Sequence, residues 1–234
     1  METKKPLTFR HELKFLISEE EKEAIISRLS CLMQCDRHAK NGIYQIRSLY
    51  FDDQNESAYV DKLSGTSSRK KYRIRNYNFS DEVIRLERKR KEDAYINKVS
   101  VLLSKEETLQ LMEGKFDFLL ERDEPLCKDF YVECVINHMR PKVIVDYDRE
   151  PYVYAAGDVR ITFDSHIRAG VFKEDMFDPN LPTIEVLEPG QLIMEVKYTE
   201  FLPYVIRDLL PTADSAYMAA SKYVMCLEKR KEFM

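Results

Sequence analysis

The chain has 234 residues, of which 44% are hydrophobic and 33% charged, and its formal net charge is −4. This length and composition are typical of a folded globular protein with a core of its own. An acidic chain is not held on nucleic acid by its overall charge, so any polyanion site must be a local concentration of basic residues.

Cysteine and histidine spacing gives no metal motif. The five cysteines form no C-x-x-C pair and the four histidines no H-x-x-x-H pair, so we do not expect a structural zinc site. The N-terminus lacks the apolar region of a secretory signal, and no apolar run is long enough to span a bilayer. We therefore expect a soluble, cytoplasmic protein with reduced thiols.

The N-terminal half alternates between extended and helical patterns. Residues 7–17 predict a first strand, and Ser18 followed by three glutamates predicts the N-cap and acidic first turn of a helix. The aromatic and β-branched composition of residues 43–52 predicts a second strand. We further expect a short helix near 55–63 and a hairpin whose strands cover 70–78 and 82–90.

The C-terminal half continues this alternation. A capping box at Ser104 predicts a short helix that ends at Gly114. Next we expect a helix through 126–137, strands at 141–154 and 159–164, and a strand pair formed by 183–187 and 191–198. A last helical region is expected to start near Phe201 and to be interrupted at Pro211. It resumes at Asp214 or Ser215 and ends near Lys229.

About eight strands separated by short helices predict an α+β fold. No internal repeat or linker divides the sequence, so a single domain over residues 1–234 is the simplest organisation. The antiparallel order of the strands allows the sheet to close into a barrel with flanking helices.

Charged residues recur two positions apart in several predicted strands. The segments that carry this pattern are Arg10–Lys14, Lys71–Arg75, Arg85–Lys89 and Glu195–Lys197. Residues i and i+2 of a strand share a face, so each segment places a row of charges on one side, and the other side is largely apolar. Several such strands indicate a closed sheet around a charged interior, which suits a phosphate-rich, metal-bearing substrate.

Two other interpretations of these charges remain open. Each pair could lie on the solvated face of an open sheet, where surface ion pairs contribute little. The basic run from Glu87 to Lys91 could also be a solvated patch or a nucleic-acid patch, although the preceding Ile84 and Leu86 favour a strand. We expect Asp164 to support a neighbouring basic side chain rather than to bind metal directly.

Six motifs, in order, resemble the VTC domain, the polyphosphate polymerase unit of the vacuolar transporter chaperone complex and of its stand-alone bacterial relatives, which belongs to the triphosphate tunnel metalloenzymes. The motifs are Glu12–Lys14, Lys71–Arg75, Leu86–Lys89, Val159–Asp164, Ile193–Lys197 and Ser221–Tyr223. The resemblance implies a closed antiparallel β-barrel tunnel. The catalytic residues that it implies are Arg73, Arg75, Lys89, Arg149, Arg160 and Lys197. The implied phosphate-binding residues are Lys14, Lys98, Lys222 and Arg140, and Arg140 competes with Arg149 for one basic position of the family. The implied metal carboxylate is Glu195, with Glu12 and Glu87 assisting. In the run from Glu87 to Lys91, alternation favours both Lys89 and Lys91, and the family match selects Lys89.

The resemblance also implies an activity and its partners. The implied reaction moves the terminal phosphoryl group of ATP onto a polyphosphate chain with Mn²⁺ or Mg²⁺ as cofactor. Basic side chains would hold the phosphates, and the metal would offset their charge. Partners would be ATP or another nucleoside triphosphate, polyphosphate or pyrophosphate, no nucleic acid, and a separate membrane partner for any export. The alternatives are hydrolysis of tripolyphosphate or nucleoside triphosphates, and polyphosphate binding without catalysis.

Overall fold

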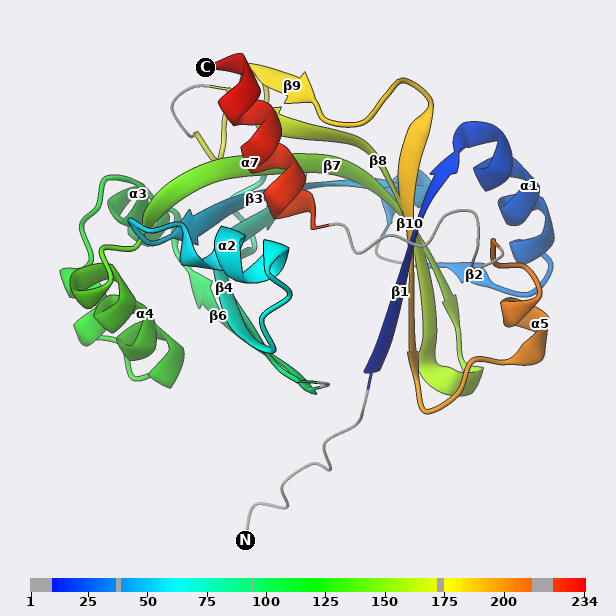
Figure 1. Ribbon diagram of the computed structural model, residues 1–234, viewed down its shortest axis with the longest axis horizontal. Helices are drawn as coiled ribbons and strands as arrows, with labels where there is room; N and C mark the ends of the chain where they lie inside the picture. Colours follow the sequence, from blue (N-terminus) through cyan, green and yellow to red (C-terminus); the bar gives the residue numbers. More distant parts are fainter. Residues whose placement is uncertain (1–9, 37–38, 94, 172–174, 212–220) are drawn as a thin grey trace, which may run out of the picture. The chain divides into compact units, whose positions relative to one another are not determined.

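The computed structural model describes residues 10–36, 39–93, 95–171, 175–211 and 221–234. The chain divides into two compact units (Figure 1). Unit 1 comprises residues 1–44, 149–165 and 187–219, and unit 2 comprises residues 45–148, 166–186 and 220–234. Each unit is described separately below.

Unit 1 has a sheet covered on one face by helical segments. Its own elements are β1 (Arg10–Ser18), α1 (Glu19–Leu29), β2 (Gln34–Cys35), η1 (Lys40–Gly42), η3 (Ala156–Asp158), β10 (Gln191–Thr199) and α5 (Tyr204–Arg207). Helix α1 begins at the predicted N-cap, and the structure adds a capping box, in which Ser18 Oγ accepts from the Glu21 amide and Glu21 accepts from the Ser18 amide. Phe15, Met194 and Phe163 lie side by side in the register and belong to the apolar core of this unit.

Unit 2 is built around an antiparallel meander with helices on its apolar face. Its elements are β3 (Tyr44–Asp52), α2 (Ser57–Leu63), β4 (Ser68–Tyr77), β5 (Ile84–Glu92), β6 (Tyr95–Leu103), α3 (Lys105–Met112), η2 (Asp117–Leu120), α4 (Pro125–Ile136), β9 (Thr183–Glu185) and α7 (Lys222–Phe233). The capping box at Ser104 is confirmed. Leu49, Ile74 and Leu86 share one row of the sheet and are fully buried in the core of unit 2.

Two long strands contribute residues to both units. They are β7 (Arg140–Tyr154) and β8 (Val159–Gly170), joined by a turn at residues 155–158. Gly157 in this turn has a φ of +74°, and a Cβ there would lie 2.7 Å from the carbonyl oxygen of Phe201. Only glycine fits that position without a shift of the backbone.

All ten strands of the described residues join one antiparallel sheet. Eight follow the order β1-β10-β8-β7-β3-β4-β5-β6, while β2 pairs with β7 and β9 pairs with β8. Within the residues that the structure describes, no hydrogen-bonded pairing joins β1 to β6 and closes this order. The predicted α+β fold with flanking helices is therefore confirmed, and closure of the barrel stays a prediction.

The structure corrects two sequence predictions and adds one strand. Residues 183–187 and 191–198 do not form a strand pair, because β9 pairs with β8 and β10 lies between β1 and β8. Strand β6 was not predicted, although all nine of its residues pair with β5. The helix predicted near Phe201 spans only Tyr204–Arg207, and the cap predicted at Asp214 or Ser215 lies outside the described residues.

Candidate functional site

In unit 1, strand register gathers predicted site residues on one face of the sheet. Lys14 of β1 pairs with Glu195 of β10, which pairs with Thr162 of β8. In the next row, Glu12 pairs with Lys197, which pairs with Arg160. Directly paired residues of antiparallel strands project to the same face, so two adjacent rows carry most of the charges predicted in this unit.

Glu195 is the centre of this charged face. Its side chain is buried, and its carboxylate contacts the ammonium groups of Lys14, at 3.8 Å, and of Lys197. Lys14 also lies 3.0 Å from Glu12, so its ammonium is held between two carboxylates. Loss of hydration lowers the pKa of the Lys197 amine, and the attraction of Glu195 only partly opposes this effect.

Arg149 and Asp164 form a buried, two-pronged ion pair on the neighbouring strands of unit 1. Arg149 donates from Nε and Nη2 to the two oxygens of Asp164 at 2.6 and 2.7 Å, and Asp164 is fully buried. This geometry confirms the expectation that Asp164 supports a basic side chain. It holds the Arg149 guanidinium in one orientation, as a bidentate carboxylate does.

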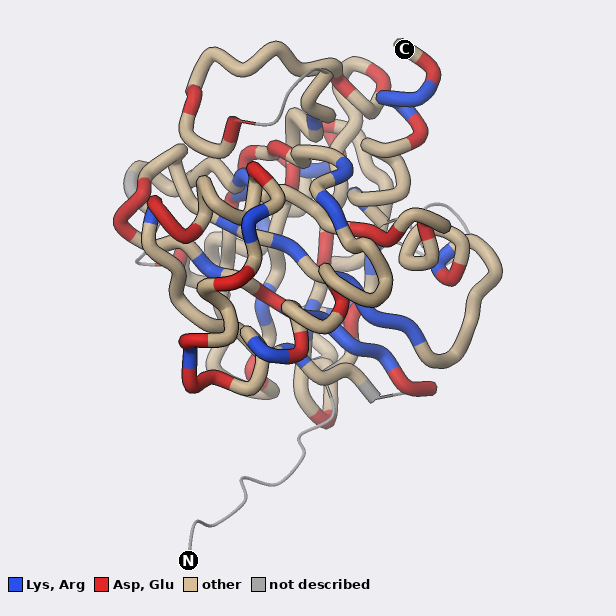
Figure 2. The backbone as a smooth tube through the Cα atoms, turned by 90° about the vertical axis from the view of Figure 1, so that its left-hand side faces the viewer, with Lys and Arg blue, Asp and Glu red and all other residues tan. Residues whose placement is uncertain are grey.

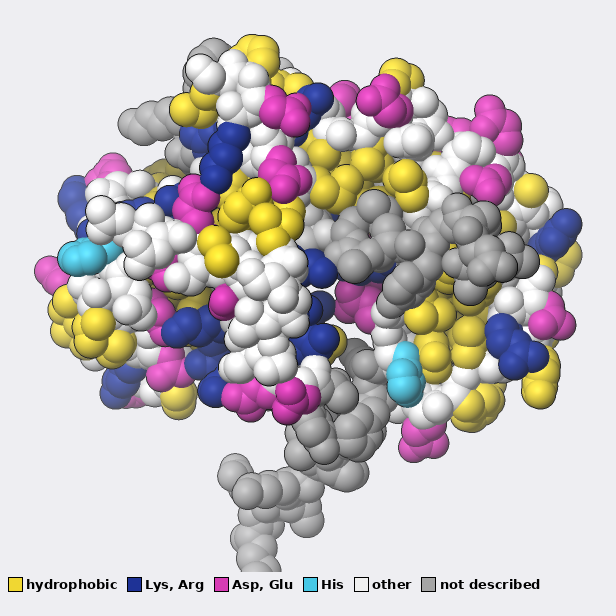
Figure 3. Space-filling model, viewed as in Figure 1, with side chains coloured by type: hydrophobic (Ala, Val, Ile, Leu, Met, Phe, Trp, Pro, Cys, Tyr) yellow, Lys and Arg dark blue, Asp and Glu magenta, His cyan; other side chains and the backbone are white. Residues whose placement is uncertain are grey.

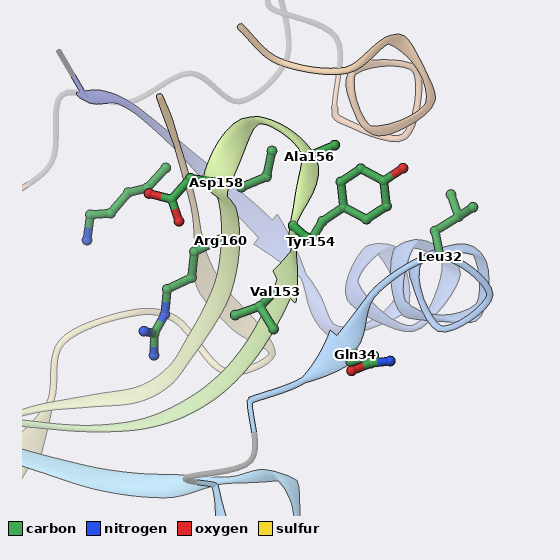
Figure 4. A pocket seen from close by; sticks show the side chains of 10 residues that line it. Leu32, Gln34, Val153, Tyr154, Ala156, Asp158 and Arg160 are labelled. Atoms are coloured by element: carbon green, nitrogen blue, oxygen red, sulfur yellow. The ribbon is translucent and has the colours of Figure 1, made fainter. Parts of the chain in front are cut away.

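A cavity of about 660 Å³ lies within unit 1, next to the second charged row (Figure 4). Arg160 and Asp158 lie at one end of it, while Tyr154 and Leu32 lie toward the other end. Lys197 also lines the cavity. Arg160 is anchored beside it by an ion pair with Asp36 at 3.0 Å and by a hydrogen bond to the Tyr44 hydroxyl at 3.1 Å.

Unit 2 carries a second charged face, on β4, β5 and β6. Arg73 of β4 pairs with Glu87 of β5, which pairs with Ser100 of β6. Two residues further along, Lys71, Lys89 and Lys98 form a row of three ammonium groups. Lys and Arg positions accordingly follow one another along neighbouring strands of this unit (Figure 2).

Glu87 is the buried carboxylate of the unit 2 face. Arg73 donates to it from Nε at 2.7 Å, and Lys98 lies 2.5 Å from its other oxygen. Burial by itself raises the pKa of Glu87, but the attraction of Arg73, Arg75 and Lys98 outweighs burial and lowers that pKa to about 2. Glu87 is therefore ionised at neutral pH and orients the basic groups around it.

Two tyrosine hydroxyls position the arginines of β4. Arg73 donates to Tyr50 at 2.8 Å, and Arg75 donates to Tyr147 at 3.0 Å and to Ser48 at 3.1 Å. Burial raises the pKa of Tyr50, but Arg73 and Arg75 outweigh it and lower the pKa overall. Tyr50 was not predicted as a site residue. Its alternation with Ser48 was the signal that both share the charged face.

The remaining predicted residues of unit 2 lie in different surroundings. Lys222, the first residue of α7, lies 5.0 Å above the ring of Tyr147, close to the group that Arg75 contacts. Lys89 is exposed in the lysine row, and Figure 3 shows Lys and Arg side chains gathered over the region of β4 and β6. Arg140 instead donates to the carbonyls of Cys134 and Met139, and no described contact joins it to another predicted site residue.

The carboxylates of unit 1 fit a divalent cation better than does Glu87. Carboxylate and hydroxyl oxygens are ligands that Mg²⁺ and Mn²⁺ favour. Glu195 and Glu12 both contact Lys14, and the buried Thr162 hydroxyl, which lies in the same row as Glu195, has no hydrogen-bond partner among the described residues. Within the described ranges, no group of three or more His, Cys, Asp or Glu residues is placed to hold a metal ion. A site here therefore needs oxygens beyond the carboxylates.

The fold is similar to that of solved cyclase-like and triphosphatase proteins. The adenylyl cyclase candidate HpAC1 from Hippeastrum, described as having a dominant triphosphatase activity, superposes with a TM-score of 0.56 at 13% identity, covering 94% of this chain and 95% of that one. An adenylate cyclase candidate from Bacillus halodurans gives a TM-score of 0.51 at 14% identity, covering 88% and 93%. At these identities the similarities concern the fold of the chain alone.

Sequence comparison identifies the family. The family model of the VTC domain matches residues 9–230, so the chain belongs to the VTC domain family, and the resemblance of its motifs is confirmed. Comparison with curated proteins found no match. Among the helices that the structure describes, none combines the length and the apolar character needed to cross a bilayer.

Proposed function

We propose that this protein is a metal-dependent polyphosphate polymerase that transfers the terminal phosphoryl group of ATP to a growing polyphosphate chain. The observation that carries the proposal is the pair of charged sheet faces, in which oriented arginines and lysines surround buried carboxylates in a member of the VTC family. The proposal includes one functional domain over residues 1–234, the closed tunnel that the family resemblance implies, and a cytoplasmic location.

Basic residues would perform most of the catalysis. Phosphoryl transfer requires positioning and charge stabilisation more than a covalent protein nucleophile. Arg73, Arg75 and Arg149 are held by fixed partners, so their guanidinium groups can bind phosphate oxygens with little loss of conformational entropy. Lys14, Lys89, Lys98, Lys197, Arg160 and Lys222 would supply further positive charge, while Arg140 is the weaker candidate.

The reaction balances without a covalent intermediate on the protein. A terminal oxygen of the polyphosphate attacks the γ-phosphorus of ATP, the bond from that phosphorus to the β,γ-bridging oxygen breaks, and ADP leaves. Glu195, with Glu12 nearby, would hold Mn²⁺ or Mg²⁺, and the bound metal would offset charge that develops on the leaving phosphate. Glu87 would serve chiefly to orient Arg73 and Lys98.

Incubation of the purified protein with ATP and Mn²⁺ tests the activity directly. Products are resolved on a polyphosphate gel beside assays for ADP and free phosphate. We expect a ladder of polyphosphate chains with ADP. Phosphate release without chains would instead establish hydrolysis, an alternative in line with the activity described for HpAC1. Polyphosphate binding without either product would indicate a binding module.

Substitution of the proposed metal carboxylate tests its role. Glu195→Gln keeps the shape but removes the charge, so we expect turnover to fall by about 100-fold or more while polyphosphate still binds. Glu188→Gln, at an exposed position outside both charged faces, is the matched control and should leave turnover unchanged. Full turnover in Glu195→Gln would exclude the metal role.

A further inference from the structure

Thr162 of β8 has a buried hydroxyl, and the packing around it does not explain why a polar atom is placed there. The residue is 3% exposed, and its Oγ1 has no hydrogen-bond partner among the described residues. A buried hydroxyl without a partner destabilises a protein, whereas valine would fill nearly the same shape without a polar atom. Packing therefore explains the β-branched shape of Thr162 and leaves its oxygen without a role.

The strand register places this oxygen in the central row of the unit 1 face. Thr162 is the direct partner of Glu195, which in turn pairs with Lys14. Directly paired residues have Cβ atoms about 4.5–5.5 Å apart on one face. Protein encloses Glu195 and Thr162, because Glu195 is only 5% exposed and Asp164 of the Arg149–Asp164 pair lies two residues along the strand from Thr162.

The carboxylates of this row and of the next row already have cationic partners. Glu195 contacts Lys14 and Lys197, and Glu12 contacts Lys14, so both carboxylates face positive charge. A neutral hydroxyl in the row of Glu195 adds a hard oxygen ligand without adding a negative charge to those of Glu195 and Glu12. The hydroxyl that supplements the phosphate-binding lysine of P-loop proteins ligates Mg²⁺ in the same chemical manner.

We propose that the Thr162 hydroxyl is an oxygen ligand of a divalent cation that Glu195 and Glu12 hold in unit 1. The proposal rests on the metal role of Glu195 in the proposed function and adds a ligand that carboxylate chemistry alone does not supply. A lone pair of Oγ1 would be donated to the cation, and the hydroxyl proton would remain available to a phosphate oxygen of the substrate.

Direct measurement of Mn²⁺ binding to the purified full chain tests this ligand without any need for turnover. Electron paramagnetic resonance counts free Mn²⁺ during a titration, and calorimetry gives the dissociation constant. We expect Thr162→Val to weaken Mn²⁺ binding by about 10- to 100-fold, the range found when groups around a metal are removed. Thr162→Ser keeps the hydroxyl and should retain most of the affinity.

Thr108 provides a matched control in unit 2. It is also fully buried, but its hydroxyl donates to the Ser104 carbonyl at 2.8 Å. Thr108→Val should leave Mn²⁺ affinity unchanged and lower the melting temperature, because it removes a satisfied hydrogen bond. Without metal, Thr162→Val should melt at the same temperature as the parent protein or higher. A lower melting temperature for Thr162→Val would show a structural role for the hydroxyl.

The outcomes separate this inference from the proposed function. Unchanged Mn²⁺ affinity in Thr162→Val, or absence of Mn²⁺ binding by the parent protein, would overturn the role of Thr162. If the parent protein synthesises polyphosphate and Thr162→Val binds Mn²⁺ with unchanged affinity, only the ligand role of Thr162 is overturned. Loss of affinity in Thr162→Val by a protein that makes no polyphosphate would overturn the polymerase proposal and leave the ligand role standing.

Discussion

The two units carry charged sheet faces of the same general design but different composition. In unit 1, Glu12 and Glu195 share Lys14, and the buried Thr162 hydroxyl lies in the row of Glu195. In unit 2, the buried carboxylate of Glu87 holds Arg73 and Lys98. Oxygen-rich surroundings suit a hard cation, and guanidinium-rich surroundings suit phosphate. The comparison teaches that alternating charge alone does not define a site, because the partners across the sheet decide its chemistry.

The buried pair of unit 1 should be the most sensitive point of either face. Asp164→Asn leaves the Arg149 guanidinium buried without a counter-charge, which typically costs about 3–5 kcal/mol of unfolding free energy. Urea denaturation at pH 7 measures the loss. Asp208→Asn, in an exposed pair with Arg207 at 3.9 Å, should change stability by less than about 0.5 kcal/mol. Equal effects would show that burial does not distinguish the two pairs.

Glu87 should give unit 2 a pH-dependent stability. Its pKa falls from 4.5 to about 2 on folding, so its stabilising contribution is complete above about pH 4.5 and is lost as the pH falls toward 2. Such a shift corresponds to an order of magnitude of about 3 kcal/mol. Unfolding free energies of the parent protein and Glu87→Gln, measured from pH 7 to pH 3, should converge as the pH falls. A constant difference would contradict this linkage.

Phosphate binding by Arg73 should depend on the planar, two-pronged shape of its guanidinium group as well as on its charge. Lysine keeps the charge but cannot contact Glu87 and Tyr50 in the same way, so Arg73→Lys should weaken tripolyphosphate binding by about tenfold, or about 1.4 kcal/mol. Isothermal titration calorimetry measures the change. Arg90→Lys lies on the opposite face of the same hairpin and is the control. Equal tripolyphosphate affinity of Arg73→Lys and Arg90→Lys would show that the phosphate does not bind at Arg73.

The helix caps should behave alike in both units. Ser18 begins α1 in unit 1 and Ser104 begins α3 in unit 2, and each forms a complete capping box. Replacement of either serine by alanine should cost about 1 kcal/mol. Thermal unfolding of the two variants gives the comparison. A cost several times larger at one cap would show that the units differ in local stability as well as in charge.

Local patterns in the sequence predicted much of the structure. The period of two in β4, β5 and β10 identified the charged face, because the alternation of side chains is a property of any strand. The N-cap at Ser18 and the capping box at Ser104 were recognised for the same reason, since their hydrogen bonds join residues three positions apart. The order of the motifs also led to the correct family.

Tertiary structure alone decided which residues meet. Pairing across strands placed Thr162 beside Glu195 and Tyr50 beside Arg73, contacts between residues 33 and 23 positions apart in the chain. The same non-local pairing assigned β9 to β8 and added β6 to the meander, neither of which was predicted. The sequence by itself determined the strands, the caps and the charged faces, because these depend on neighbouring residues. Register between distant strands is set by the packing of the whole sheet, and only the folded chain revealed it.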